Sequence, residues 1–246
     1  GERYLEGGQW IEYTVRAETL QVRRGRPEVV RIRETIRGPV VSDALPGLGA
    51  DLSVVWTAST SDARSTGLWD MNRAGSVAEF DRAVRGFSQP HQNVVFASVE
   101  GRIGYRLGGR VPVRGEWDGS VPVPAERMGE GFRGTWPPAM HPAGFDPAAG
   151  FIATANNLQA PGLGTAVSTD YAAPFRAARI SDRLASRSDW DVESVYELQH
   201  DVYSPLGVRY RTLAVETARR MGEGDAASRL VRLPEPVCLT ESCLQD

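Results

Sequence analysis

The chain has 246 residues and a mass of 26.8 kDa, with 41% hydrophobic and 24% charged residues, which is ordinary for a globular protein. Its net charge is -3 and its basic residues form no stripe, which argues against a nucleic-acid partner. The longest apolar runs are only a handful of residues, far too short for a membrane span.

The first third of the sequence has the pattern of β-strands. Ile11, Tyr13 and Val15 fall on one face of residues 10–16, which predicts a half-buried strand. A turn at 24–27 follows, with its glycine and proline. The other strands predicted here are 20–23, 29–32 and 52–59, the last of them a buried strand with the sequence LSVVWTAS.

A helix is predicted next. Ser76 and Glu79 have the spacing of a capping box, which marks a helix start. Apolar residues at helical spacing then define one face, and Pro90 closes the unit. That face consists of Val77, Phe80, Val84 and Phe87.

A hairpin and a long loop come after the helix. Residues 93–99 and 102–107 flank Glu100-Gly101, and Gly101 offers the positive φ that a tight turn needs. Residues 108–150 are rich in glycine and proline and contain Trp117 and Trp136. Because a disordered segment seldom carries such large aromatics, we expect a packed, functional loop.

The last strand candidate is 151–155, and the chain beyond residue 171 has helical patterns. The predicted helices are 174–186, 191–200 and 207–221. Strands, one helix, more strands and then helices indicate an α+β fold with mainly antiparallel sheets. We expect residues 1–246 to form a single, partial domain.

Two adjacent carboxamides, Asn156 and Asn157, end the last strand candidate. An uncharged NH2 group at such a position can point into a cleft and stabilise an oxyanion at every pH. The alternative is a side-chain cap on a turn, a position that asparagine favours. The sequence alone leaves both interpretations open.

Other catalytic arrangements have little support. The three histidines, His91, His141 and His200, show no metal-binding spacing, and neither HExxH nor GxSxG occurs. A Ser-His-Asp arrangement stays open, because geometry rather than order defines it. Cys238 and Cys243 lie near the C-terminus and either pair or stay free.

Four ordered blocks resemble the β-subunit of the penicillin acylase family, which are N-terminal-nucleophile hydrolases. The match spans roughly residues 1–221, whereas 234–246 do not resemble the family. The resemblance implies a partial αββα sandwich and an amide hydrolase that cleaves an acyl group from an amine. The blocks are GGQWIEYTVRAETLQVRRGRPEVVRIRETIRGPVVSD, QNVVFASVEGRIGYRLGGRVPVR, GFIATANN and PFRAARISDRL.

The resemblance also implies roles for two catalytic residues. Asn156 matches the asparagine whose side-chain NH2 forms half of the oxyanion hole. Arg176 matches the arginine that orients the catalytic groups, a task suited to a planar, permanently charged guanidinium. Arg179, one helical turn later, is the alternative arginine.

Three further positions follow from the same resemblance. Trp56 matches a tryptophan of the acyl pocket, although a core tryptophan is an equal alternative. Gln92 falls in the wall of that pocket, where a polar group argues against a phenylacetyl preference. Asp170 resembles one ligand of a structural calcium ion, and an exposed loop aspartate is the alternative. No cofactor is expected for the chemistry itself.

The family's nucleophile, an N-terminal serine whose own α-amine is the base, has no counterpart in this sequence. The chain starts at Gly1 without an initiator methionine, so we expect a piece of a longer protein that is inactive alone. Its expected partners are an α-subunit, the rest of the β-subunit and a small N-acyl amide. The resemblance favours a periplasmic or extracellular location. Two alternatives are a non-catalytic acylase-like binding module and a purely structural segment.

Overall fold

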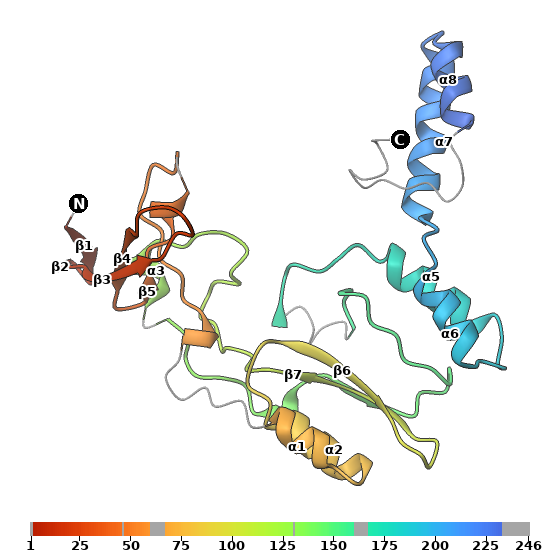
Figure 1. Ribbon diagram of the computed structural model, residues 1–246, viewed down its shortest axis with the longest axis horizontal. Coiled ribbons are helices and arrows are strands. Elements are labelled where there is room, and N and C mark those ends of the chain that lie inside the picture. The colour runs from red at the N-terminus through yellow and green to blue at the C-terminus, as the bar shows by residue number, and fades with distance from the viewer. Residues whose placement is uncertain (1, 46, 60–66, 130, 160–166, 233–246) are drawn as a thin grey trace. The chain divides into compact units, whose positions relative to one another are not determined.

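The computed structural model describes residues 2–45, 47–59, 67–129, 131–159 and 167–232 (Figure 1). Backbone contacts divide the chain into two compact units: Gly1–Phe145 with Ala160–Asp170, and Asp146–Gln159 with Tyr171–Asp246. All described strand pairs are antiparallel, and helices lie both between the strands and after them in the chain. The predicted α+β class is therefore confirmed. Cys238 and Cys243, whose pairing the sequence left open, lie outside the described residues.

The strand predicted at 10–16 is in fact two strands that meet at Tyr13. Trp10 pairs with Leu5 of the first strand, whereas Thr14 pairs with Glu34, so the chain changes partner at this tyrosine. The buried Tyr13 hydroxyl donates to Asp51 Oδ2 at 2.8 Å. The strands of this region are β1 (Arg3–Glu6), β2 (Gln9–Glu12), β3 (Thr14–Leu20), β4 (Glu28–Thr35) and β5 (Gly38–Pro39).

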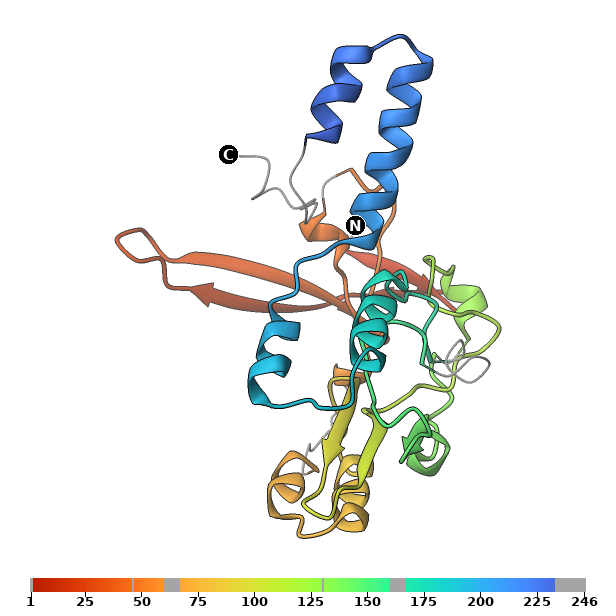
Figure 2. The ribbon, with the colours of Figure 1, turned by 90° about the vertical axis from the view of Figure 1, so that its right-hand side faces the viewer.

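β3 and β4 form a long two-stranded ribbon (Figure 2). Its last pair joins Leu20 to Glu28, so the predicted turn at 24–27 is confirmed, with Arg24 at a φ of 62°. The strand predicted at 20–23 continues no further than Leu20. Every residue of β3 is exposed, because this ribbon has no described layer against either face.

The buried strand predicted at 52–59 is wrong. Only an isolated bridge from Ser53 to Val40 forms there, and the run ends in a short 3-10 helix, η2 (Thr57–Ser59). Val54 is 38% exposed and Trp56 63% exposed, so the apolar run does not lie between two layers. The alternative of a core tryptophan at Trp56 is therefore excluded in the described structure.

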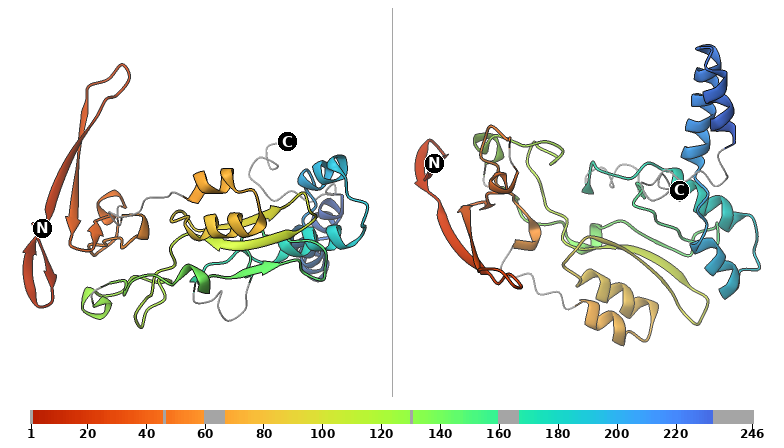
Figure 3. Two further views of the ribbon diagram at one scale, coloured as in Figure 1. Left: turned by 90° about the horizontal axis from the view of Figure 1, so that it is seen from below. Right: turned by 45° about the horizontal axis from the view of Figure 1, so that its top comes forward.

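The predicted helix and hairpin are confirmed and pack together (Figure 3). The Ser76 hydroxyl accepts the Glu79 N–H at 3.3 Å, as the capping box requires, and Glu79 accepts from the Gly75 N–H at 2.8 Å. The third strand, β8, was not predicted. The elements are α1 (Gly67–Arg73), α2 (Val77–Arg85), β6 (Gln92–Ala97), β7 (Ile103–Gly108) and β8 (Ala143–Phe145).

The core of this unit lies between α2 and β7. Val84 and Val111 are completely buried, and both belong to this region. Beside them, Arg106 is 4% exposed and forms an ion pair with Asp81. The short elements of the unit are η1 (Ser42–Ala44), α3 (Ala125–Met128) and η3 (Pro138–Met140).

The second unit consists of the 146–159 segment and helices. Residues 151–155 form no strand with any described residue, so the last predicted strand is wrong. The three predicted helices are confirmed, and a fourth, which was not predicted, packs against the third. They are α5 (Phe175–Ala185), α6 (Val192–Gln199), α7 (Pro205–Arg220) and α8 (Gly224–Val231).

Candidate active site

The two adjacent carboxamides have different environments. Asn157 Oδ1 accepts hydrogen bonds from the Ala155 N–H at 3.1 Å and from Gln159 Nε2 at 2.8 Å. Its Nδ2 donates to the Leu158 carbonyl at 3.3 Å. Asn157 therefore holds the turn together, which is the capping role that asparagine often has.

Asn156 is exposed, and its backbone lies in the left-handed region with a φ of 59°. Asparagine tolerates this conformation better than most residues do. The Asn156 carbonyl accepts the Ala172 N–H at 2.9 Å, which ties the turn to the segment before α5. The Asn156 side chain takes no part in the hydrogen bonds that Asn157 makes.

Arg176 contacts this side chain from the first turn of α5. Its Nη2 donates to Asn156 Oδ1 at 2.7 Å and to the Ala155 carbonyl at 2.9 Å. A guanidinium has donors only, so the amide oxygen must face it and the NH2 group must point away. Within the described residues, that NH2 donates to no partner.

The alternative arginine, Arg179, is engaged elsewhere. Its Nε and Nη2 both donate to Asp201 Oδ2, at 3.0 and 2.8 Å, and its guanidinium lies 4.5 Å from the centre of the Tyr203 ring. Of the two arginines, Arg176 is thus the one in contact with Asn156. Asp201 was not predicted to contribute, although it directly follows the helix predicted at 191–200.

Trp56 and Gln92 both lie in the first unit. Trp56 directly precedes η2, and Gln92 opens β6, where it is exposed and pairs with Gly108. Gln89 Nε2 donates to the Thr57 carbonyl at 3.2 Å, so the segment after Trp56 is joined to the approach to β6. The acyl-pocket roles of Trp56 and Gln92 stay predictions.

Asp170 is exposed, and its N–H donates to the Ser168 hydroxyl at 3.1 Å. It lines a pocket of about 440 Å³ with Asp118 and Arg114, among others. Calcium takes about six to eight oxygen ligands. Among the described residues no group of three or more acidic, histidine or cysteine side chains is placed to hold a metal ion. These residues by themselves do not fit the implied calcium site.

The histidines make no catalytic arrangement in the part of the chain that the structure describes. His141 is buried, its Nδ1 lies 3.2 Å from the Leu107 carbonyl, and burial lowers its pKa. His200 Nδ1 lies 2.8 Å from the Tyr196 carbonyl of its own helix. No described histidine ring bonds to a serine, a cysteine or a carboxylate, so a Ser-His-Asp triad is absent there.

None of the helices in the described ranges has the length and apolar character that crossing a membrane requires.

Known proteins with similar sequences identify the family of this chain. The penicillin amidase family model matches residues 1–233. An acyl-homoserine lactone acylase QuiP from Pseudomonas fluorescens is 33% identical over 214 residues, 85% of this chain and 26% of the relative. A penicillin acylase 2 proenzyme from a Pseudomonas species is 33% identical over 216 residues, 85% of this chain and 28% of the relative.

A solved structure agrees with these sequence relatives. The thermostable penicillin G acylase from Alcaligenes faecalis superimposes with a TM-score of 0.70 at 21% identity, covering 95% of this chain and 40% of its own. The fold is therefore that of penicillin G acylase. The chain spans about a quarter of the length of the curated relatives that it matches. By sequence and by fold, this chain belongs to the penicillin amidase family.

Proposed function

We propose that this chain is part of an acylase that hydrolyses a small N-acyl amide, and that the Asn156 NH2 stabilises the oxyanion of the reaction. The nucleophilic serine lies outside this chain and comes from the rest of the β-subunit. An α-subunit completes the enzyme. The relatives named acyl-homoserine lactone acylase and penicillin acylase support this substrate class.

The observation that supports the proposal is the polarity of the contact between Asn156 and Arg176. Because the guanidinium binds the amide oxygen at 2.7 Å, it fixes which end of the carboxamide faces outward. The contact also withdraws electron density from the amide and makes its NH2 a better donor. The result is a fixed, uncharged donor on an exposed turn.

The reaction needs such a donor whenever negative charge develops on the carbonyl oxygen. The serine hydroxyl gives its proton to the serine's own α-amine as its oxygen bonds to the acyl carbon, and the carbonyl π electrons move onto oxygen and create the negative charge. The Asn156 NH2 donates to that oxygen until the C–N bond breaks and the amine leaves with a proton. Water then hydrolyses the acyl ester through a second oxyanion in the same place. A donor fixed in advance stabilises both without rearranging.

Trp56 and Gln92 contribute to the acyl pocket in this proposal. Trp56 offers 63% of its surface for an acyl chain to cover. The exposed amide of Gln92 makes the wall polar and favours acyl groups that accept or donate a hydrogen bond.

Two replacements of Asn156 in the complete acylase test the proposal. Asn156→Ala removes the donor and is expected to lower kcat by about 10²–10³ with little change in the melting temperature. Asn156→Asp keeps the size and the contact with Arg176 but replaces the donor by an acceptor, so it is expected to lose at least as much.

The aspartate variant separates the proposal from a structural role. If Asn156 only anchored Arg176, a carboxylate would serve equally well and Asn156→Asp would stay active, which would refute the oxyanion assignment. Asn72→Ala, which removes an exposed carboxamide from α1, is the matched control and should leave kcat unchanged. A binding module would instead hold the N-acyl amide without turnover even in the unmodified protein.

A further inference from the structure

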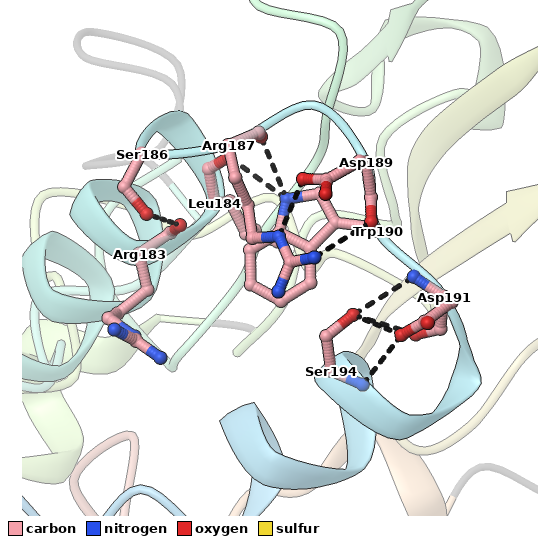
Figure 4. A network of polar contacts seen from close by, with 8 residues as sticks. All are labelled: Arg183, Leu184, Ser186, Arg187, Asp189, Trp190, Asp191 and Ser194. Atoms are coloured by element: carbon pink, nitrogen blue, oxygen red, sulfur yellow. Dashed lines mark hydrogen bonds and ion pairs between the residues drawn. The ribbon is translucent and has the colours of Figure 1, made fainter.

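The α5–α6 hairpin is fastened where its helices connect. Trp190 Nε1 donates to the Leu184 and Arg187 carbonyls, at 3.2 and 3.0 Å, and so caps the end of α5 (Figure 4). Asp191 then starts α6 with a capping box, in which its carboxylate accepts the Ser194 N–H at 2.8 Å. The turn between the helices therefore has little freedom to move.

At the open end of the hairpin, the carboxylate of Asp201 joins α5 to the segment after α6. Its Oδ2 accepts two bonds from Arg179 of α5, at 3.0 and 2.8 Å. Its Oδ1 accepts the Tyr203 N–H at 2.9 Å, which fixes the direction of the carboxylate. The Asp201 side chain is only 14% exposed, so solvent screens this pair less than a surface ion pair.

A second arginine depends on the same oxygen. Arg183 Nε is buried, makes no hydrogen bond within the described residues and lies 3.8 Å from Asp201 Oδ2. Arg179 and Arg183 are neighbours one turn apart on α5, where like charges repel. Without the Asp201 charge, the helix would carry two adjacent guanidinium groups whose shared carboxylate partner is gone.

These contacts determine how α5 is rotated about its axis. Arg176 lies one turn before Arg179 on the same helix, so a rotation that moves Arg179 also moves Arg176. The contact between Arg176 and Asn156 is 2.7 Å long and directional, and a small rotation would break it.

We propose that Asp201 is a positioning residue for the reaction, which acts through Arg179 and the orientation of α5 to keep Arg176 on the Asn156 amide oxygen. This inference rests on the proposed function of Asn156. In this proposal Asp201 touches neither the substrate nor Asn156. Its effect on turnover requires Arg176.

A double-mutant cycle in the complete acylase tests the proposal. Asp201→Asn keeps the shape of the side chain and removes its charge. It is expected to lower kcat about tenfold with KM nearly unchanged. In an Arg176→Ala background the same substitution is expected to change kcat by less than about twofold, because the group it positions is gone. An equal loss in both backgrounds would overturn the proposal.

A second variant and a control complete the experiment. Arg179→Lys keeps the positive charge and loses the two-bond fork, so it is expected to give a smaller loss that also disappears in the Arg176→Ala background. If Asp201→Asn does not fold, Arg179→Lys tests the positioning role in its place. Asp189→Asn removes an exposed partner of Arg187 in the same hairpin and should have no effect on kcat.

The outcomes distinguish this inference from the proposed function. If Asn156→Ala and Arg176→Ala both retain full turnover, the proposed function itself fails. If those two variants lose turnover and Asp201→Asn does not, only the positioning role of Asp201 is refuted.

Discussion

Arg106 and Arg176 make the same two kinds of contact in opposite surroundings. Each donates to one side-chain oxygen and one backbone carbonyl: Arg106 to Asp81 and Pro138, Arg176 to Asn156 and Ala155. The Arg106 side chain is 5% exposed and its partner is an anion. Arg176 is exposed and its partner is neutral.

The difference shows that the burial of an arginine determines whether its partner must be charged. A buried guanidinium needs a carboxylate, because an uncompensated charge is costly away from water. Asp81 also binds Arg85, so its oxygens are occupied and it has no NH2 to offer. An exposed guanidinium can hold a neutral amide, and that amide keeps a donor free. The first arrangement stabilises a core and the second leaves a group available for chemistry.

The largest expected effect is on the buried arginine. Arg106→Met is expected to lower the free energy of unfolding by about 3 kcal/mol, because it leaves the Asp81 carboxylate buried without its main partner. Equilibrium urea unfolding measures this. Arg85→Ala removes the more exposed partner of the same carboxylate and should cost no more than about 1 kcal/mol. Equal losses of unfolding free energy in Arg106→Met and Arg85→Ala would show that burial of the arginine does not set the size of the effect.

Arg176→Lys is expected to affect turnover rather than stability. Stability should hardly change, since this contact is exposed, while kcat should fall about tenfold because an ammonium cannot direct the amide as a fork does. Steady-state kinetics and thermal melting are measured on the same samples. Arg187→Lys, at another exposed guanidinium of the second unit, is the control. Unchanged turnover in Arg176→Lys would show that charge alone suffices.

The smallest effect is expected in acid, and of the two arginine contacts only the one between Arg106 and Asp81 should contribute to it. Burial opposes the ionisation of Asp81, but hydrogen bonds from Arg106 and Arg85 outweigh it and hold the Asp81 pKa below 3.8. Folding thus favours the carboxylate. Its contribution to stability is complete above the ordinary aspartate pKa and is lost as pH falls through the lower folded value.

Unfolding midpoints of the unmodified protein and of Asp81→Asn, measured from neutral pH into acid, test this contribution. The unmodified protein should lose stability more steeply below the ordinary aspartate pKa. Parallel curves would contradict the expectation. Asn156→Ala should follow the unmodified curve, because the Asn156–Arg176 contact contains no carboxylate.

The local elements of the fold were predictable where one short pattern determines them. Ser76 and Glu79 marked the start of α2, and Gly101 marked the β6–β7 turn, where its φ is 80°. The predictions failed where distant residues decide. The strand breaks at Tyr13, where pairing passes from β1 to β4, and no pattern within 10–16 indicates that change of partner.

The local geometry at Asn156 was predictable to a similar extent, while its catalytic role stays a prediction. The resemblance selected Asn156 and Arg176, whose contact the structure describes, yet periodicity could not separate Arg176 from Arg179. That separation depends on Asp201, which lies beyond a second helix in the chain. Nor could the sequence tell which of two identical amides holds the turn, because only their hydrogen-bond partners in the fold distinguish them.

The left-handed backbone at Asn156 also bears on how the protein would age. Spontaneous hydrolysis, in which water replaces the amide nitrogen and ammonia leaves, converts asparagine to aspartate, which tolerates this conformation and would bind Arg176 as an ion pair. If the NH2 has the proposed role, a preparation that deamidates there would keep its fold and its melting temperature while its activity faded. Shelf life would then have to be followed by mass and turnover rather than by any measure of folding.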